Sequence, residues 1–77
     1  MKEQSSSMLQ GLYWDATYEI ALALKARYPD QDLEAVSLGD VFEWTVALPK
    51  FADDPELAND EILGAIYREW FEVNNPL

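Results

Sequence analysis

The sequence predicts a small all-α domain of three principal helices, joined by connections that contain one or two short helical turns. Apolar residues recur at intervals of three and four in three separate stretches, which is the periodicity of helices with one buried face. Residue types that begin or end helices flank each stretch, and no stretch alternates convincingly with period two as a half-buried strand does. With 77 residues, the chain has the length of a single domain.

The first predicted helix begins near Asp15, because aspartate commonly caps helix N-termini. Apolar residues follow at helical spacing within 20–24. Pro29 disfavours helical geometry at the residue before it and is expected to end the helix. A single helical turn over 33–36 is expected next, with Asp32 as its cap.

The second predicted helix opens at Gly39-Asp40 and ends before Pro49. Its apolar stripe, spaced i, i+3, i+4 and i+7, consists of Val41, Trp44, Thr45 and Leu48. Another short turn is expected where Asp54 precedes Pro55, since proline loses no hydrogen bond at the first helical position.

The third predicted helix begins after Asn59, a good capping residue, with Asp60 and Glu61 in its positively polarised first turn. Its apolar stripe consists of Ile62, Ala65, Ile66, Trp70 and Val73. The sequence Asn74-Asn75-Pro76 is a stop signal. Trp44 and Trp70 lie on apolar stripes and are expected in the core, whereas Tyr13-Trp14 is expected to form a hydrophobic staple ahead of the first helix.

Residues 1–10 are polar and serine-rich, and we expect them to form a flexible N-terminal extension outside a domain that spans 11–77. No apolar run approaches the roughly 20 residues that a membrane-spanning helix needs. The N-terminus also lacks the apolar stretch of a signal peptide. The expected location is therefore the cytoplasm.

The chain contains neither cysteine nor histidine. These absences remove disulfides, thiolate nucleophiles, the usual general base and the ligands that softer metals prefer. Paired carboxylates exist, but so short a chain offers little pocket in which to desolvate one. We therefore expect no enzymatic activity and no tightly bound cofactor.

The net charge is −10, and residues 39–77 carry most of it, with nine acidic and two basic side chains. A protein with this negative charge repels phosphate backbones and anionic lipids, so binding to nucleic acid or membranes is not expected. A basic protein surface or a hard cation would be attracted. We expect a monomer.

The densest acidic segment is 53–61, with five acids and no base. Capping of two helix starts would account for two or three of these carboxylates, and the surplus suggests pairing with arginine and lysine of a partner or retention of a cation. Both interpretations stay open. The candidate partner-binding or iron-binding residues are Asp30, Asp32, Asp40, Glu43, Asp53, Asp54, Glu56, Asp60 and Glu61.

Carboxylates without histidine or cysteine suit hard ions such as calcium, magnesium, manganese or iron. The segment that starts at Asp30 fails the calcium-loop pattern, because Ala35 and Val41 stand where a glycine and a bidentate glutamate are needed. Any metal site is therefore expected to be exposed and weak. Its candidate ligands are Asp53, Asp54 and Asp60.

Several spaced motifs occur together in this chain. In order they are Tyr13-Trp14, Tyr28-Pro29-Asp30-x-Asp32, Asp40 with Trp44, Phe51-x-Asp53-Asp54-Pro55, and Asn59 ahead of Ile62-Leu63-x-Ala65-Ile66-x-x-x-Trp70. In this arrangement the sequence resembles the IscX family, without gaps from about Gly11 to Glu72.

The resemblance implies a winged-helix-like, mainly helical fold and a role as an acidic accessory of bacterial iron–sulfur cluster assembly. Such proteins bind the cysteine desulfurase IscS near the surface that the frataxin homologue uses, bind iron weakly through carboxylates, and act as regulators or iron suppliers. The acids that match the family pattern by position are Asp30, Asp32, Asp40, Asp53, Asp54 and Asp60. Pro49-Lys50 departs from the family, which often has acids there, and residues 1–10 have no counterpart.

Three hypotheses follow. The first is an adaptor that docks through carboxylates on a cysteine desulfurase. The second is an iron-carrying chaperone. The third is a generic acidic interaction module, or a DNA mimic, that binds a different basic partner.

Overall fold

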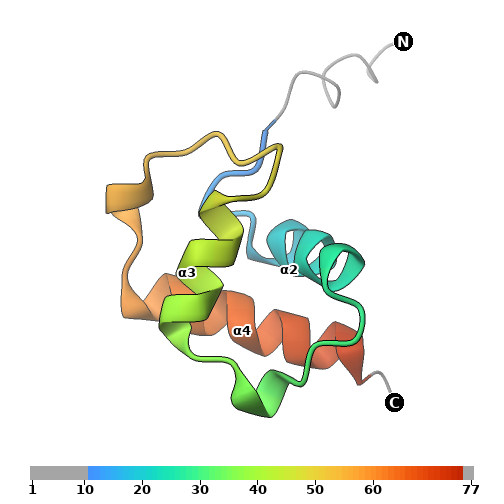
Figure 1. The fold of residues 1–77 in the computed structure, drawn as a ribbon. Coiled ribbons are helices and arrows are strands. Elements are labelled where there is room, and N and C mark those ends of the chain that lie inside the picture. Colours follow the sequence, from blue (N-terminus) through green and yellow to red (C-terminus); the bar gives the residue numbers. More distant parts are fainter. Residues whose placement is uncertain (1–10, 76–77) are drawn as a thin grey trace, which may run out of the picture.

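The computed structural model describes residues 11–75, and the predicted extension 1–10 lies outside this range. Three α-helices form the body of the protein: α2 (Thr17–Arg27), α3 (Leu38–Val46) and α4 (Asp60–Asn74) (Figure 1). Two single-turn 3₁₀ helices lie in the connections, η1 (Leu33–Ala35) and η2 (Pro55–Leu57). Residues 11–75 contain no strand, only an isolated parallel bridge between Leu12 and Phe51. The predicted all-α fold is confirmed.

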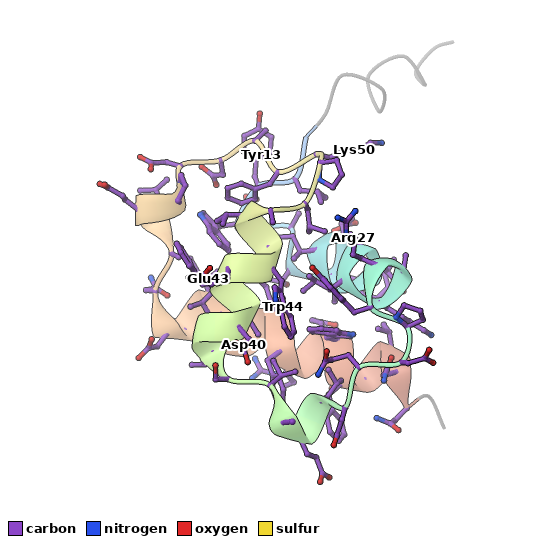
Figure 2. The ribbon with its side chains drawn as sticks, in the orientation of Figure 1. Tyr13, Arg27, Asp40, Glu43, Trp44 and Lys50 are labelled. Carbon is purple, nitrogen blue, oxygen red and sulfur yellow. The ribbon has the colours of Figure 1, made fainter. Side chains whose placement is uncertain are left out.

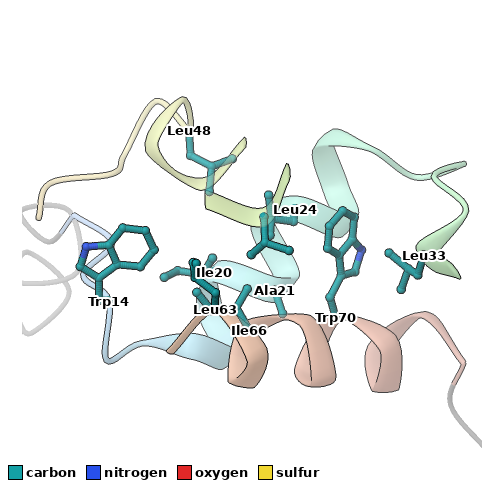
Figure 3. Close-up of a cluster of buried hydrophobic side chains, with 10 residues drawn as sticks. Trp14, Ile20, Ala21, Leu24, Leu33, Leu48, Leu63, Ile66 and Trp70 are labelled. Atoms are coloured by element: carbon teal, nitrogen blue, oxygen red, sulfur yellow. The ribbon is translucent and has the colours of Figure 1, made fainter. Parts of the chain in front are cut away.

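The core lies where α2 and α4 pack along each other and α3 crosses them (Figures 1 and 3). Its largest fully buried side chains come from all three helices: Trp70, Ile20, Leu24, Ile66, Val41 and Thr45. The contact between α2 and α4 is the most extensive between elements, and α3 shares less contact with either helix. No helix formed by the described residues is long and apolar enough to cross a membrane.

Three of the predicted caps are confirmed. The side chains of Asp32, Asp54 and Asn59 accept backbone N–H bonds at the starts of η1, η2 and α4, at 3.0, 2.9 and 2.8 Å. Each cap satisfies a donor that has no partner within its own helix. These starts were predictable because the capping residue and its acceptor group are neighbours in sequence.

The predicted cap at Asp15 is wrong. Helix α2 begins at Thr17, and Ala16 occupies the capping position without a side-chain bond. Asp15 instead lies in a tight turn, closed by a bond of 2.9 Å from the Ala16 N–H to the Tyr13 carbonyl. This turn leaves the Asp15 side chain exposed.

The second helix begins earlier than the predicted Gly39-Asp40. Ser37 is the true cap of α3, since its hydroxyl accepts the Asp40 N–H at 3.1 Å while the Asp40 carboxylate accepts the Ser37 N–H at 3.1 Å. This reciprocal pair is a capping box, which satisfies two donors at once. Asp40 therefore lies in the first turn of α3 and does not open it.

The same helix also ends earlier than expected, at Val46. The N–H of Leu48 bonds the Thr45 carbonyl at 3.0 Å, so the chain tightens into a turn. The cause is Pro49, which disfavours helical geometry at the residue before it.

Trp14 joins the N-terminal segment to the connection that follows α3. Its side chain is 2% exposed, its backbone N–H donates to the Asp53 carboxylate at 2.9 Å, and its indole N–H donates to the Asp54 carbonyl at 2.8 Å. The other Asp53 oxygen accepts the Asp54 N–H at 2.7 Å. The indole ring stacks on Phe42 and meets the edge of Phe51. Trp14 thus packs on aromatic residues distant in sequence, in place of the predicted staple.

Backbone pairing beside Trp14 completes this junction. The Leu12 N–H donates to the Lys50 carbonyl at 2.7 Å, and the Ala52 N–H donates to the Leu12 carbonyl at 2.9 Å. These two segments of the chain approach each other closely. A Cβ atom on Gly11 would lie 2.4 Å from the Ala52 Cβ and 2.7 Å from the Lys50 carbonyl oxygen. We call residues 11–14 and 50–54, held by these contacts, the Trp14 junction.

A second set of aromatic side chains closes the opposite end of the core. Tyr28 stacks on Trp44, which meets Trp70 edge to face with ring centroids 6.2 Å apart. Trp70 is fully buried, as predicted, whereas Trp44 is only partly buried and packs against the core. The Tyr67 hydroxyl donates to the Leu33 carbonyl at 3.0 Å and ties η1 to α4.

Two buried polar atoms, Thr45 Oγ1 and Trp70 Nε1, have no hydrogen-bond partner within residues 11–75. An unsatisfied buried group costs about 1–3 kcal/mol, so each is a local weakness in an otherwise apolar core.

Gly11→Ala should destabilise the protein, because the added methyl group would meet backbone and Cβ atoms that cannot move without breaking the Leu12 pairing. The matched control is Gly64→Ala, in the middle of α4, where a Cβ atom would meet nothing within 4 Å. The control should raise the free energy of unfolding by about 0.5–1 kcal/mol, since alanine favours helices. Urea unfolding followed by far-UV circular dichroism measures both. Equal effects of the two substitutions would contradict the close packing at Gly11.

Asp53→Ala should lower the free energy of unfolding by about 1–3 kcal/mol, because it leaves the Trp14 N–H without its acceptor. Asp53→Asn, which keeps one side-chain oxygen, should lie between Asp53→Ala and the unmodified protein. Glu56→Ala removes a nearby exposed carboxylate and should leave stability unchanged within about 0.5 kcal/mol. Chemical unfolding of the three variants tests this order.

Candidate functional site

One hollow in the described surface is lined by apolar side chains and by acidic ones, which we call its rim. It has a volume of about 660 Å³ and is open to solvent. We call it the acidic hollow, and its lining residues are Tyr13, Trp14, Asp15, Thr17, Asp53, Leu57, Glu61, Ile62 and Ala65. Three of them are acids and none is a base. The hollow therefore offers negative charge around an apolar surface.

The three carboxylates reach the rim from different parts of the fold. Asp53 is fixed by its bond to Trp14, Asp15 lies in the turn before α2, and Glu61 lies in the first turn of α4. The N-termini of α2 and α4 both border the hollow, since Thr17 and Glu61 line it. Helix N-termini carry partial positive charge, which stabilises carboxylates near them. This placement lets like charges gather without a large cost to folding.

Two large apolar side chains of the hollow are unusually exposed, Tyr13 at 47% and Leu57 at 58%. Apolar or aromatic anchors inside a charged rim are typical of protein interfaces. A bound surface that covered these side chains would gain apolar contact and, at the rim, ion pairs.

The sequence-based candidates did not include Tyr13, Asp15 or Leu57. Tyr13 was assigned to a staple and Asp15 to a cap, both from local pattern alone. Leu57 could have been singled out from the sequence, because it is the one large apolar residue in the acidic segment 53–61. A side chain of that kind between acids is either buried or an anchor, and only the structure shows which.

The structure brings together some of the nine predicted carboxylates. Asp53 and Glu61 line the acidic hollow, and Asp54, Glu56 and Asp60 flank it at η2 and at the start of α4. The other four candidates lie elsewhere. Asp40 and Glu43 are on α3 (Figure 2), Asp30 is in the turn after α2, and Asp32 lines a different hollow together with Glu34 and Phe71.

The capping interpretation accounts for part of this acidity. Four of the nine carboxylates accept backbone N–H bonds, namely Asp32, Asp40, Asp53 and Asp54. The remaining five are exposed side chains, namely Asp30, Glu43, Glu56, Asp60 and Glu61. The surplus beyond capping is therefore concentrated in Glu56, Asp60 and Glu61 beside the hollow.

Residues 11–75 hold no group of three or more carboxylates placed to share a metal ion. Of two of the predicted ligands, Asp53 has both side-chain oxygens engaged by backbone N–H groups, and Asp54 has one. The third, Asp60, is exposed at the start of α4. The residues present thus fit no preformed iron site, and weak binding of iron stays a prediction.

Comparison with known proteins identifies the family of this chain. A family model described as iron–sulphur cluster assembly matches residues 12–75. An uncharacterized protein of Pseudomonas aeruginosa is 38% identical over 61 residues, which cover 79% of this chain and 92% of that protein. The match includes all three helices and the whole Trp14 junction except Gly11. The chain therefore belongs to the iron–sulphur cluster assembly family, the IscX family that its motifs resemble.

Proposed function

We propose that the protein is an accessory of iron–sulphur cluster assembly that docks through the acidic hollow on a basic surface of a cysteine desulfurase. The observation that carries the proposal is the juxtaposition of three rim carboxylates with the exposed Tyr13 and Leu57. Family membership supports a role in cluster assembly. The desulfurase is the partner that the resemblance of the sequence motifs implies.

The two kinds of side chain contribute differently to such a complex. Exposed carboxylates accelerate encounter with a positively charged surface and set its orientation, and their effect falls as salt screens them. Tyr13 and Leu57 would lose water on contact and supply affinity that depends little on salt. The proposed role is that of a regulator, without catalysis by this chain.

Weak iron binding belongs to the same proposal as a secondary property. Carboxylate oxygens attract hard cations, but without a three-ligand group in residues 11–75 the remaining ligands must be water or groups of a partner. Binding of iron would therefore be loose and would compete with docking for the same carboxylates.

The double variant Glu56→Lys/Glu61→Lys should weaken binding to a purified cysteine desulfurase by about tenfold or more, because it reverses two exposed charges at the hollow. Glu34→Lys/Glu72→Lys makes the same change in net charge at the other end of the molecule and should have a much smaller effect. Titration calorimetry at two salt concentrations measures both.

Asp53 and Asp54 are unsuitable for this test, since substitution of Asp53 removes a bond of the Trp14 junction and substitution of Asp54 removes the cap of η2. Equal loss of affinity in the two double variants would reduce the interaction to nonspecific charge attraction. Absence of binding by the unmodified protein would favour the generic acidic module with another partner.

Leu57→Ser should also weaken desulfurase binding, by about fivefold or more, while leaving its salt dependence unchanged. The reason is that it removes apolar contact but no charge. Leu22→Ser changes a comparably exposed leucine on α2 and serves as the control, with no effect expected. A steeper or shallower salt dependence in Leu57→Ser, or an equal loss in the control, would contradict the anchor role.

A further inference from the structure

A second hollow has the opposite electrostatic character. It has a volume of about 390 Å³, and we call it the basic hollow; its lining residues are Leu12, Ala23, Ala26, Arg27, Leu48, Pro49 and Lys50. Five of these are apolar, two are basic and none is acidic. Residues 11–75 contain only four basic residues among many acids, so two of the four line one small surface.

The fold itself opens this hollow. Ala23 and Ala26 lie three residues apart on α2, so they share a face, and their short side chains leave space beside Leu48. The connection 48–50 forms the other wall. It is held in place by the bond of 2.7 Å from the Leu12 N–H to the Lys50 carbonyl. The hollow is therefore a fixed feature of the Trp14 junction.

Helix capping does not explain both bases. Arg27 lies at the C-terminus of α2, where a positive side chain favours the helix. Lys50 lies outside any helix, and Figure 2 shows it in the same upper region of the view as Arg27. Two like charges that line one hollow repel each other. An acidic ligand would remove that repulsion.

The basic hollow shares no lining residue with the acidic hollow. Along the N-terminal segment, Leu12 lines the basic hollow, and the next two residues, Tyr13 and Trp14, line the acidic one. The same backbone pairing thus supports two surfaces of opposite charge. An inference about the basic hollow does not rest on the function proposed for the acidic one.

We propose that the basic hollow is a second docking surface, which takes a segment of an acidic protein partner with apolar side chains flanked by carboxylates. Its apolar lining matches aliphatic side chains, and Arg27 and Lys50 complement carboxylates on either side of them. The hollow is open to solvent, which suits side chains of a polypeptide better than a small molecule that must be largely enclosed. The protein would then join a basic partner on one surface to an acidic partner on the other.

The test uses the full-length, ¹⁵N-labelled protein and the synthetic peptide acetyl-Asp-Leu-Leu-Glu-amide, followed by amide chemical shifts. We expect saturable shifts at Ala23, Ala26, Arg27 and Lys50, which weaken as salt is added. The peptides acetyl-Asp-Ser-Ser-Glu-amide and acetyl-Lys-Leu-Leu-Lys-amide should not produce them, since one lacks the apolar side chains and the other has the wrong charge.

The matched variants are Lys50→Glu and Arg68→Glu, which change the net charge equally. Lys50→Glu should weaken peptide binding by about threefold or more, and Arg27→Glu/Lys50→Glu by about tenfold or more, whereas Arg68→Glu, on the exposed side of α4, should have little effect. Circular dichroism verifies that each variant is folded. Equal effects of Lys50→Glu and Arg68→Glu, or shifts spread over the whole protein, would overturn the proposal.

Two other occupants are distinguished by measurements without peptide. Shifts at the same amides on dilution of the protein would show that a second copy fills the hollow. Shifts at these amides in Met8→Ser/Leu9→Ser would show that the chain's own N-terminal residues fill it. Either result would overturn the assignment to a partner protein.

Discussion

The Trp14 junction is the constraint on which the rest of the structure depends. Trp14 is held by two hydrogen bonds, one from its backbone N–H and one from its indole N–H, to residues 39 and 40 positions away, and its ring makes two aromatic contacts. The three helices by themselves bury an apolar core, but they do not fix the long connection between α3 and α4. The junction fixes it, and thereby fixes the relative positions of Asp53, Lys50 and η2.

The Trp14 junction positions residues that line both hollows. Segment 12–14 contributes to each of them, and segment 48–53 supplies Lys50 to one and Asp53 to the other. Charged groups on a rigid backbone lose little freedom when a partner binds, so less of the interaction energy is lost to ordering. Asp53 combines two roles, since one side chain both anchors Trp14 and lines the acidic hollow.

The accumulation of acids is compatible with stability because of where they lie. Asp60 and Glu61 are in the first turn of α4, Asp40 is in the first turn of α3, and Asp32 and Asp54 cap 3₁₀ turns. At helix N-termini a carboxylate gains from the helix dipole what it loses by repulsion from other acids. An acidic surface built from helix starts is thus favourable for recognition at little cost to the fold.

The sequence predicted the features that depend on neighbouring residues. The all-α class, the three helices and the caps at Asp32, Asp54 and Asn59 follow from periodicity and from residue types a few positions apart. The cap at Asp15 failed because a distant contact, that of Trp14 with Asp53, determines the local turn. The acidic hollow could be predicted only in part for the same reason: the pairing of 11–14 with 50–54 leaves no local pattern.

The unsatisfied hydroxyl of Thr45 has a consequence for local unfolding. Helix α3 shares less contact with α2 and α4 than these two share with each other, and its buried hydroxyl lacks a partner within residues 11–75. Opening of α3 would let water bond that oxygen. Opening of α4 would likewise release the indole N–H of Trp70 to water, but it breaks the most extensive contact between elements, so α3 opens at the lower cost in free energy. Amide hydrogens of α3 should therefore exchange before those of the α2–α4 pair. Asp40 and Glu43 belong to this most labile helix, so the acidic surface has a durable part around α4 and a transient part on α3.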